Sequence, residues 1–250
     1  MTDSLSIERF LQDVNEVFTL PPERDTSVKP FLGKDATRLS FGLSNPTLRK
    51  QATIIGKSYR KNLTVVDVSD ALFDLYSTTQ YLEPHIFIPC LLTAISQPSD
   101  FTNIDVWNTI KRFVPFADSW VAVDMLCLEY LGRFPVFESP FLDDVREWNS
   151  SSKLFVRRTS IAVFCRPCRK IAASVPVALE VTKTLLECKD NLIRKCVAWI
   201  CKESSKSDPS TVFMFLRQNY TKIYWGTLND AMSKLNQEQR SELTKLKKGR

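Results

Sequence analysis

Hydrophobic residues recur along the chain at intervals of three and four, the spacing of amphipathic helices. Short polar turns separate these stretches, and the segment 64–68 comes nearest to the alternation of a strand. The pair Asp208–Pro209 and Asp190 fit the cap and first-turn positions of helices. The pattern predicts helices over residues 4–18, 46–60, 67–76, 84–96, 103–113, 119–131, 139–149, 152–164, 175–188, 191–205, 209–218 and 227–235.

Helices joined by short turns are typical of helical repeats, in which each antiparallel pair covers the previous one. No strict sequence period appears, so we expect degenerate HEAT-like pairs rather than consensus repeats. We predict an all-α fold in a single domain over residues 1–250, with an irregular loop at 19–40 and a basic tail at 240–250. We expect this tail to be frayed from Lys245 onwards, and its charge would equally serve solubility.

Positive charge is concentrated in the second part of the chain. Residues 1–150 contain 14 Lys and Arg against 20 Asp and Glu, whereas residues 151–250 contain 20 against 8. A strongly basic half indicates a polyanionic partner, with nucleic acid the leading candidate, although a solvated basic surface has the same composition. The six glycines in 250 residues argue against glycine-rich phosphate loops.

The cysteine content and the start of the chain bear on its environment. An odd number of cysteines, seven, favours free thiols, and the first ten residues lack the basic and apolar regions of a secretory signal. No stretch is long and apolar enough to span a membrane. We expect an intracellular protein without membrane attachment, cytoplasmic in a prokaryote and nuclear in a eukaryote.

Cys165 and Cys168 have the spacing of a zinc ribbon, but no second pair of this kind follows. With His85 the only histidine, a zinc site would need other cysteines to converge: Cys188, Cys196 or Cys201. We therefore expect no metal and buried, inert cysteines.

Asp124 stands where helical spacing favours an apolar residue. At 100° per residue it points into an apolar arc, whose predicted members are Trp120, Val121, Met125, Cys127, Leu128 and Leu131. Because Trp120 precedes Asp124 by one turn on the same face, the pair indicates a small site for a cationic, flat or sugar-like ligand. A structural aspartate bonded to a helix end or to an arginine fits the same pattern.

Two groups of basic residues accompany apolar helices in the basic half. Lys195, Trp199, Lys202 and Lys206 follow one helical stripe, as a phosphate backbone with an adjacent sugar or base requires. Lysines extended around a half-buried core tryptophan would look the same. Two arginines, Arg157 and Arg158, interrupt another apolar helix, and one of them must reach solvent or meet an anion.

Four segments together resemble the AlkD-like DNA alkylation repair family. They are residues 41–49, 118–124, 156–159 and 194–199, the last followed by Asp208–Pro209, and the likeness extends over about residues 40–235. The resemblance implies an α-solenoid of HEAT-like helical repeats with a basic concave face that grips duplex DNA. It also implies an N-glycosylase that releases N3- and N7-alkylated purines. We expect a monomer, the default for a solenoid that wraps DNA, and no cofactor.

The resemblance also implies roles for particular residues. Asp124 would be the central carboxylate, Trp120 and Trp199 would face the sugar, and Arg158 would hold a phosphate. We expect further DNA contacts from Arg157, Arg194, Lys195, Lys202 and Lys206. Two departures from the family pattern are Ser119, where an aromatic residue often stands, and the Cys165–Cys168 segment.

The chemistry suits a chain with a single histidine. An alkylated purine is already cationic, so its glycosidic bond breaks without a general acid. A carboxylate at position 124 would stabilise positive charge on the sugar and place a water molecule. Two further hypotheses are a non-catalytic HEAT-like protein that binds bent, branched or damaged DNA, and a solenoid that binds an acidic protein.

Overall fold

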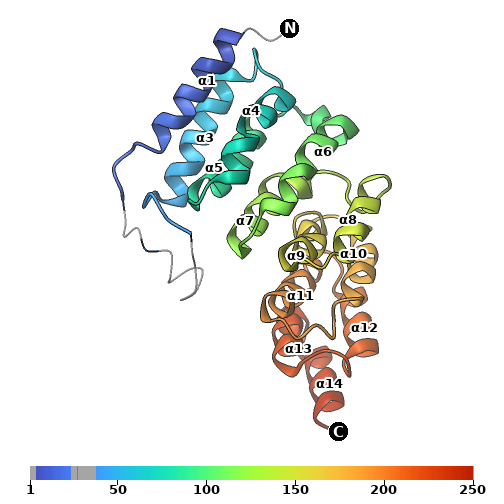
Figure 1. Cartoon of the computed structure of the whole chain (residues 1–250). Helices are drawn as coiled ribbons and strands as arrows, with labels where there is room; N and C mark the ends of the chain where they lie inside the picture. The colour runs from blue at the N-terminus through green and yellow to red at the C-terminus, as the bar shows by residue number, and fades with distance from the viewer. Residues whose placement is uncertain (1–3, 24–26, 28–37, 250) are drawn as a thin grey trace. The chain divides into compact units, whose positions relative to one another are not determined.

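The computed structural model describes residues 4–23, 27 and 38–249 (Figure 1). Every regular element in this part of the chain is helical, and an isolated bridge joins Leu39 to Tyr81. The predicted all-α fold is therefore confirmed for the described residues, while most of the predicted loop at 19–40 lies outside them. Among the described helices, none is long and apolar enough to cross a lipid bilayer.

The chain separates into two compact units, which we call unit 1 (Met1–Phe134) and unit 2 (Pro135–Arg250). Unit 1 contains α1 (Ser4–Val17), α3 (Asn45–Tyr59), α4 (Val65–Thr78), α5 (Glu83–Ile95), α6 (Ile104–Ile110) and α7 (Trp120–Met125). Short 3₁₀ segments cover Pro98–Thr102, Lys111–Phe116 and Leu131–Arg133, and a π-helical turn covers Leu126–Tyr130.

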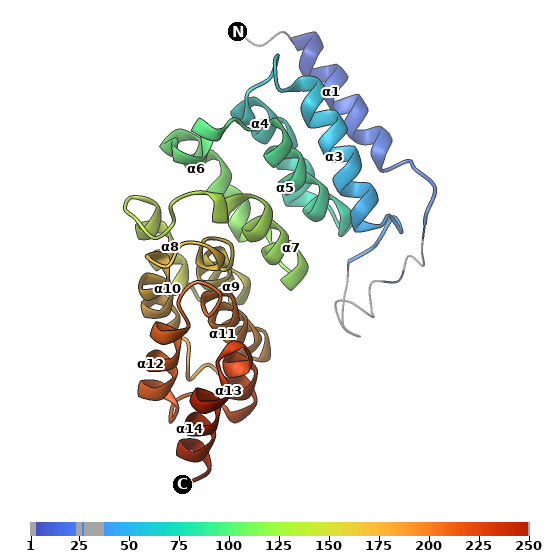
Figure 2. The same cartoon turned by 180° about the vertical axis from the view of Figure 1, so that it is seen from behind.

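Helix α5 is the centre of unit 1. Its residues from Glu83 to Leu92 are all buried, and it packs against α3, α4 and α7, while α1 covers α3 and α4 (Figures 1 and 2). Helices α3 and α5 approach closely because Gly56 has no side chain. A Cβ atom at this position would lie only 2.5 Å from the Cβ atom of Ala94.

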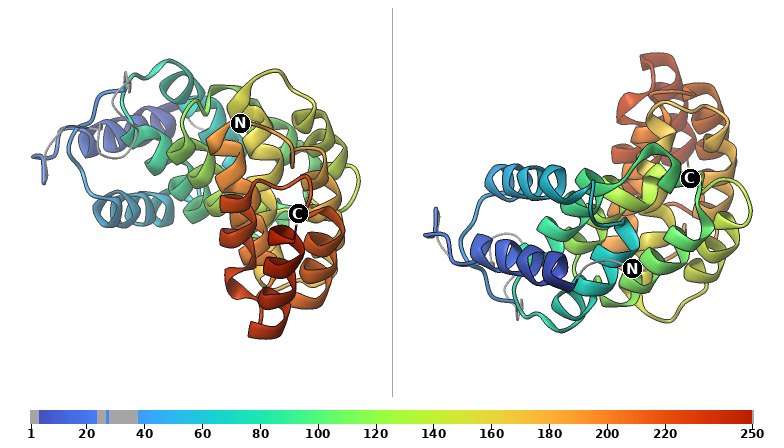
Figure 3. Two further views of the ribbon diagram at one scale, coloured as in Figure 1. Left: turned by 90° about the horizontal axis from the view of Figure 1, so that it is seen from below. Right: turned by 90° about the horizontal axis from the view of Figure 1, so that it is seen from above.

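Unit 2 contains α8 (Phe141–Asn149), α9 (Leu154–Ala162), α10 (Ser174–Lys183), α11 (Asn191–Ser204), α12 (Pro209–Asn219), α13 (Trp225–Ala231) and α14 (Gln237–Lys248). Short 3₁₀ segments cover Val163–Cys165, Pro167–Arg169 and Met232–Lys234. Helices α9, α11 and α13 pack in succession as one row, and α10, α12 and α14 as a second row (Figures 1 and 3). This order is that of stacked helical pairs.

Polar caps explain where several helices begin. Asp190 and Asp208 cap α11 and α12 as predicted, each accepting hydrogen bonds from backbone N–H groups of the first turn. The segment 64–68, which resembled a strand, starts α4 instead, because Thr64 and Asp67 form a reciprocal capping box.

The predicted fraying of the chain end is wrong for the residues up to Lys248, which are helical. Asn236 caps α14, whose Leu243 is fully buried. The ammonium group of Lys247 donates hydrogen bonds of 2.8 Å to the carbonyl oxygens of both Tyr220 and Ile223. Packing of one leucine and capping of two carbonyls therefore hold this basic segment as a helix.

Candidate active site

The helix that carries Trp120 and Asp124 begins at a serine cap. Ser119 is the N-cap of α7, and its hydroxyl oxygen accepts a hydrogen bond of 3.2 Å from the N–H of Ala122. Serine is among the best N-cap residues, whereas an aromatic side chain at this position would leave the N–H unpaired. Ser119, which departs from the family pattern, therefore has a local structural role as the N-cap of α7.

Trp120 and Asp124 both lie half-buried on the surface side of α7. The predicted apolar arc is partly wrong, because Val121 and Leu128 are also half-buried. The buried side is formed by Ala122, Val123, Met125, Leu126, Cys127, Tyr130 and Leu131. The π-helical turn directly after Met125 changes the register of the residues within and after it, which accounts for Leu128 but not for Val121. Asp124 thus stands at the edge of the core, with access to solvent.

Arg49, at the end of the first segment of the family resemblance, contacts residues that directly follow the second segment. Nη2 of Arg49, on α3, lies 2.8 Å from Oε1 of Glu129 and 3.8 Å from the sulfur of Met125, the residue after Asp124. The Arg49 side chain is 45% exposed. A cation near α7 is therefore fixed by an ion pair and still reaches solvent.

Arg158 is buried, which the sequence did not predict. It lies on α9 with 5% of its surface exposed, and Nη1 donates a hydrogen bond of 2.6 Å to the carbonyl oxygen of Leu192 in α11. The partners of Arg158 therefore include a backbone carbonyl group, which the helix pattern did not indicate. The neighbouring Arg157 is half-buried, and its Nε atom is buried without a hydrogen-bond partner among the described residues.

Trp199 lies half-buried on α11, beside a carboxylate that the sequence reasoning missed. Its indole N–H donates a hydrogen bond of 3.3 Å to Oε1 of Glu203, one turn further along the helix. The other oxygen of Glu203 accepts from Nε of Arg169 at 2.5 Å and from Nζ of Lys206 at 2.6 Å. Burial alone raises the pKa of Glu203, but the hydrogen bond from Lys206 and the charge of Arg169 outweigh it, and the pKa is lowered.

The remaining basic residues of the predicted stripe differ in their surroundings. Lys195 is exposed, whereas Nζ of Lys202 lies 2.8 Å from Oδ1 of Asp230 on α13. Arg194 donates from Nε to the carbonyl oxygen of Cys188 at 3.0 Å, and its guanidinium lies 4.6 Å from the ring centroid of Tyr224. Tyr224 is 60% exposed, so this cation–π pair is at the surface.

The structure brings the predicted site residues together in two sets. Trp120 and Asp124 share α7 of unit 1, whereas Arg158 and Trp199 lie on the adjacent helices α9 and α11 of unit 2, and the basic stripe follows α11 and ends at Lys206, just beyond it. Sequence reasoning missed Arg169 and Glu203. The four-residue spacing from Trp199 to Glu203 was a visible signal, since it repeats the spacing from Trp120 to Asp124.

The cysteines are mostly enclosed in the two units. Cys165 and Cys168 are fully buried, and burial raises the pKa of the Cys201 thiol to about 12. Cys188 is the most exposed of the cysteines. Within the part of the chain that is described, no group of three metal-ligating side chains converges.

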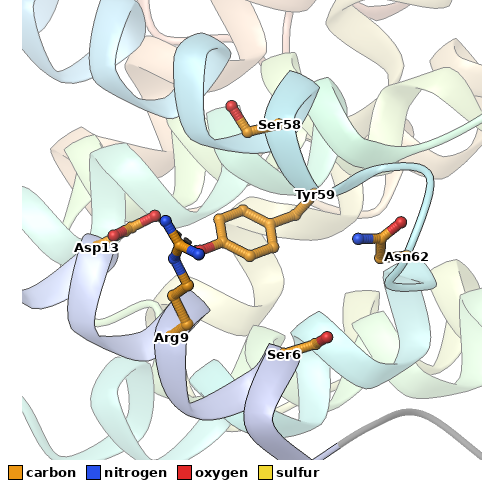
Figure 4. Close-up of a pocket in the computed structure, with 6 residues that line it drawn as sticks. All are labelled: Ser6, Arg9, Asp13, Ser58, Tyr59 and Asn62. Carbon is orange, nitrogen blue, oxygen red and sulfur yellow. Dashed lines mark hydrogen bonds between the residues drawn. The ribbon is translucent and has the colours of Figure 1, made fainter.

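An open polar pocket of about 480 Å³ lies between α1 and α3 of unit 1 (Figure 4). It is lined by Ser6, Arg9, Asp13, Ser58, Tyr59 and Asn62. The Tyr59 hydroxyl donates a hydrogen bond of 2.7 Å to Oδ2 of Asp13, which occupies one wall of the pocket (Figure 4). Its lining includes none of the predicted site residues.

Comparison with known families gives one match that spans most of the chain. A family model described as DNA alkylation repair enzyme matches residues 21–235. The matched region includes both tryptophans of the candidate site, as well as Asp124 and Arg158. No curated protein matches the chain.

Proposed function

Since the chain belongs to the DNA alkylation repair enzyme family, we propose that it is a DNA N-glycosylase that excises cationic N3- and N7-alkylated purines from duplex DNA. The observation that carries the proposal is the position of Asp124. This carboxylate lies at the solvent edge of α7, one helical turn after the half-buried Trp120. A protein that only binds the phosphate backbone gains nothing from such a carboxylate.

The proposed reaction is hydrolysis of the bond between the sugar and the damaged base. Alkylation places a positive charge on the purine, so the base leaves as a neutral molecule without being protonated. The sugar becomes an oxocarbenium ion, and water adds to its C1′ carbon and loses a proton. The carboxylate of Asp124 stabilises the cationic sugar and holds the attacking water.

The aromatic side chains complement this carboxylate. The π faces of Trp120 and Trp199 favour a cationic sugar by about 0.5–2 kcal/mol each. Half-burial of both rings leaves part of each indole available to a ligand. Trp120 belongs to unit 1 and Trp199 to unit 2.

The basic half of the chain supports the choice of DNA as substrate. Lys195 and Arg194 are accessible on α11, the helix that also carries Trp199. Arg158 differs from these two residues, because its Nη1 atom already donates a hydrogen bond to the carbonyl oxygen of Leu192. We propose that Arg158 fixes α9 to α11 and contributes its positive charge to the binding of a phosphate at the edge of this contact.

The test of the proposal is release of 7-methylguanine from a methylated duplex. A glycosylase releases the free base faster than the spontaneous rate and leaves an abasic site that alkali cleaves. Binding of the same duplex without release would favour a non-catalytic DNA-binding protein instead. Lesion-blind, weak binding that salt hardly affects would favour an acidic protein partner.

A further inference from the structure

The Cys165–Cys168 segment departs from the family pattern, and the structure connects it to the candidate site. The 3₁₀ segment Pro167–Arg169 packs against α11, with Cys168 and Cys201 both fully buried. The hydroxyl of Ser207 donates a hydrogen bond of 2.6 Å to the carbonyl oxygen of Cys168. This packing places Arg169, the residue after the second cysteine, beside the end of α11.

Arg169 and Lys206 meet at one oxygen of a buried carboxylate. Nε of Arg169 lies 2.5 Å and Nζ of Lys206 2.6 Å from Oε2 of Glu203, whose side chain is 10% exposed. The two cationic groups are therefore immediate neighbours. Oε1 of the same carboxylate accepts the indole N–H of Trp199 at 3.3 Å, so both cations are fixed relative to this tryptophan.

The cluster retains both charge and hydrogen-bond donors. One carboxylate neutralises one of two cations, so the cluster has a net positive charge. Arg169 uses only Nε and Lys206 only one N–H within the described residues, and their side chains are 40% and 44% exposed. Both Nη groups of Arg169 and the remaining ammonium N–H bonds are thus left for a ligand.

We propose that Arg169 and Lys206, held side by side by Glu203, form a binding site for one phosphate of the DNA backbone next to Trp199. The proposal rests on the proposed function, since it places this phosphate beside the nucleotide that Trp199 contacts. An arginine and a lysine in contact give a planar donor pair and a compact charge, which suit the oxygens of one phosphodiester. Glu203 is a positioning residue that keeps the two cations together when DNA is absent.

The experiment measures the affinity of the full chain for a short undamaged duplex as a function of salt concentration. Arg169→Ala and Lys206→Ala are each expected to weaken binding about fivefold to tenfold at low salt. The slope of log K against log salt should fall by about one unit in each variant. Because both residues contact one phosphate, the double variant should also lose about one unit rather than about two.

Arg217→Ala is the matched control. Nε of Arg217 on α12 lies 2.6 Å from Oε1 of Glu242, and the side chain is 51% exposed. This variant removes an equivalent ion pair in the other row of helices and should leave both affinity and slope unchanged. Lys206→Ala removes a largely exposed side chain and keeps the test valid if Arg169→Ala fails to fold.

Unchanged slopes in Arg169→Ala and Lys206→Ala would overturn the proposal, as would a loss of about two units in the double variant. Absence of duplex binding by the wild type would overturn it as well. Release of 7-methylguanine tests the proposed function separately. If the variants show the expected loss of slope but the wild type releases no 7-methylguanine, the phosphate site stands and the glycosylase function is refuted.

Discussion

Arg38 binds Asp118 across 80 residues of sequence, and this contact fixes the start of the helix that carries Asp124. Nε of Arg38 lies 2.7 Å from Oδ1 of Asp118, and a second donor, Nη2, contacts the same oxygen. Nη1 donates to the carbonyl oxygens of Thr79 and Tyr81 at 3.1 and 3.2 Å. One arginine therefore joins the segment before α3, the turn before α5 and the cap region of α7.

Replacement of Arg38 should affect both stability and turnover. The side chain of Arg38 is only 10% exposed, and Arg38→Gln leaves the part-buried carbonyl groups of Thr79 and Tyr81 without their donor. We expect a loss of about 1–3 kcal/mol in the free energy of unfolding. The rate of base release should fall more than the affinity for duplex DNA, because α7 is no longer held at its start. Urea unfolding and single-turnover release measure the two effects.

Arg112→Gln is the control for this prediction. Arg112 also pairs with an aspartate of unit 1, Asp70, but its side chain is 44% exposed. Its loss should cost well under 1 kcal/mol, as for most surface ion pairs. Equal stability losses in the two variants would contradict the anchoring role of Arg38.

The single histidine makes the stability of unit 1 depend on pH. His85 is fully buried, and burial together with the nearby charge of Arg38 lowers its pKa to about 4. The unfolded chain, with an ordinary histidine pKa of about 6.5, binds the proton first. Stability is therefore lost as the pH falls from about 6.5 to about 4, by about 3 kcal/mol in all.

Urea titrations at several pH values check this prediction, and His85→Gln should remove this part of the pH dependence. Because the chain has one histidine, its ring protons give a single resolved titration in proton NMR spectra. A midpoint near 6.5 in the folded protein would contradict the burial of His85.

The cysteines should differ sharply in reactivity. Cys188 is partly exposed, whereas the other cysteines are buried, and burial raises the pKa of Cys90 and of Cys201 to about 12. A thiol reagent such as Ellman's reagent should therefore modify one cysteine quickly in the folded protein and the rest only after unfolding. Cys188→Ser should abolish the fast phase. Rapid reaction of Cys165 or Cys168 would contradict the packing of their segment under α11.

The sequence predicted the helices well because each one is a local pattern. Apolar spacing and capping residues such as Asp190 and Asp208 act within one or two turns of chain. The register after Asp124 was beyond such reasoning, since a π-helical turn replaces the uniform helix that the spacing assumes. The helix at the C-terminal end was missed because charge dominates its sequence and one buried residue, Leu243, anchors it.

The site was predictable in its members but not in their surroundings. Helical spacing alone placed Trp120 and Asp124 on one face. The buried guanidinium of Arg158 is hydrogen-bonded to the carbonyl oxygen of Leu192, 34 residues away. The buried carboxylate of Glu203 is paired with Arg169, also 34 residues away. Such contacts between elements leave no trace in the local pattern of either segment. The assembly of all four proposed residues around one nucleotide stays a prediction.

The most direct measurement of the central claim compares Asp124→Asn with the wild type in release of 7-methylguanine from a methylated duplex under single-turnover conditions. The substitution removes the charge that stabilises the cationic sugar and keeps the shape of the side chain. We expect the rate to fall by a factor of about 10²–10³, the usual loss when one electrostatic contact to the transition state is removed. Duplex affinity should be equal or slightly higher, since a negative charge facing phosphate has gone.

Asp70→Asn serves as the control, because Asp70 is an exposed aspartate of unit 1 outside the proposed site, and it should release the base at the wild-type rate. Release by the wild type that Asp124→Asn largely loses, with affinity retained, is the result that our account predicts. Equal rates of release for Asp124→Asn and the wild type would contradict it.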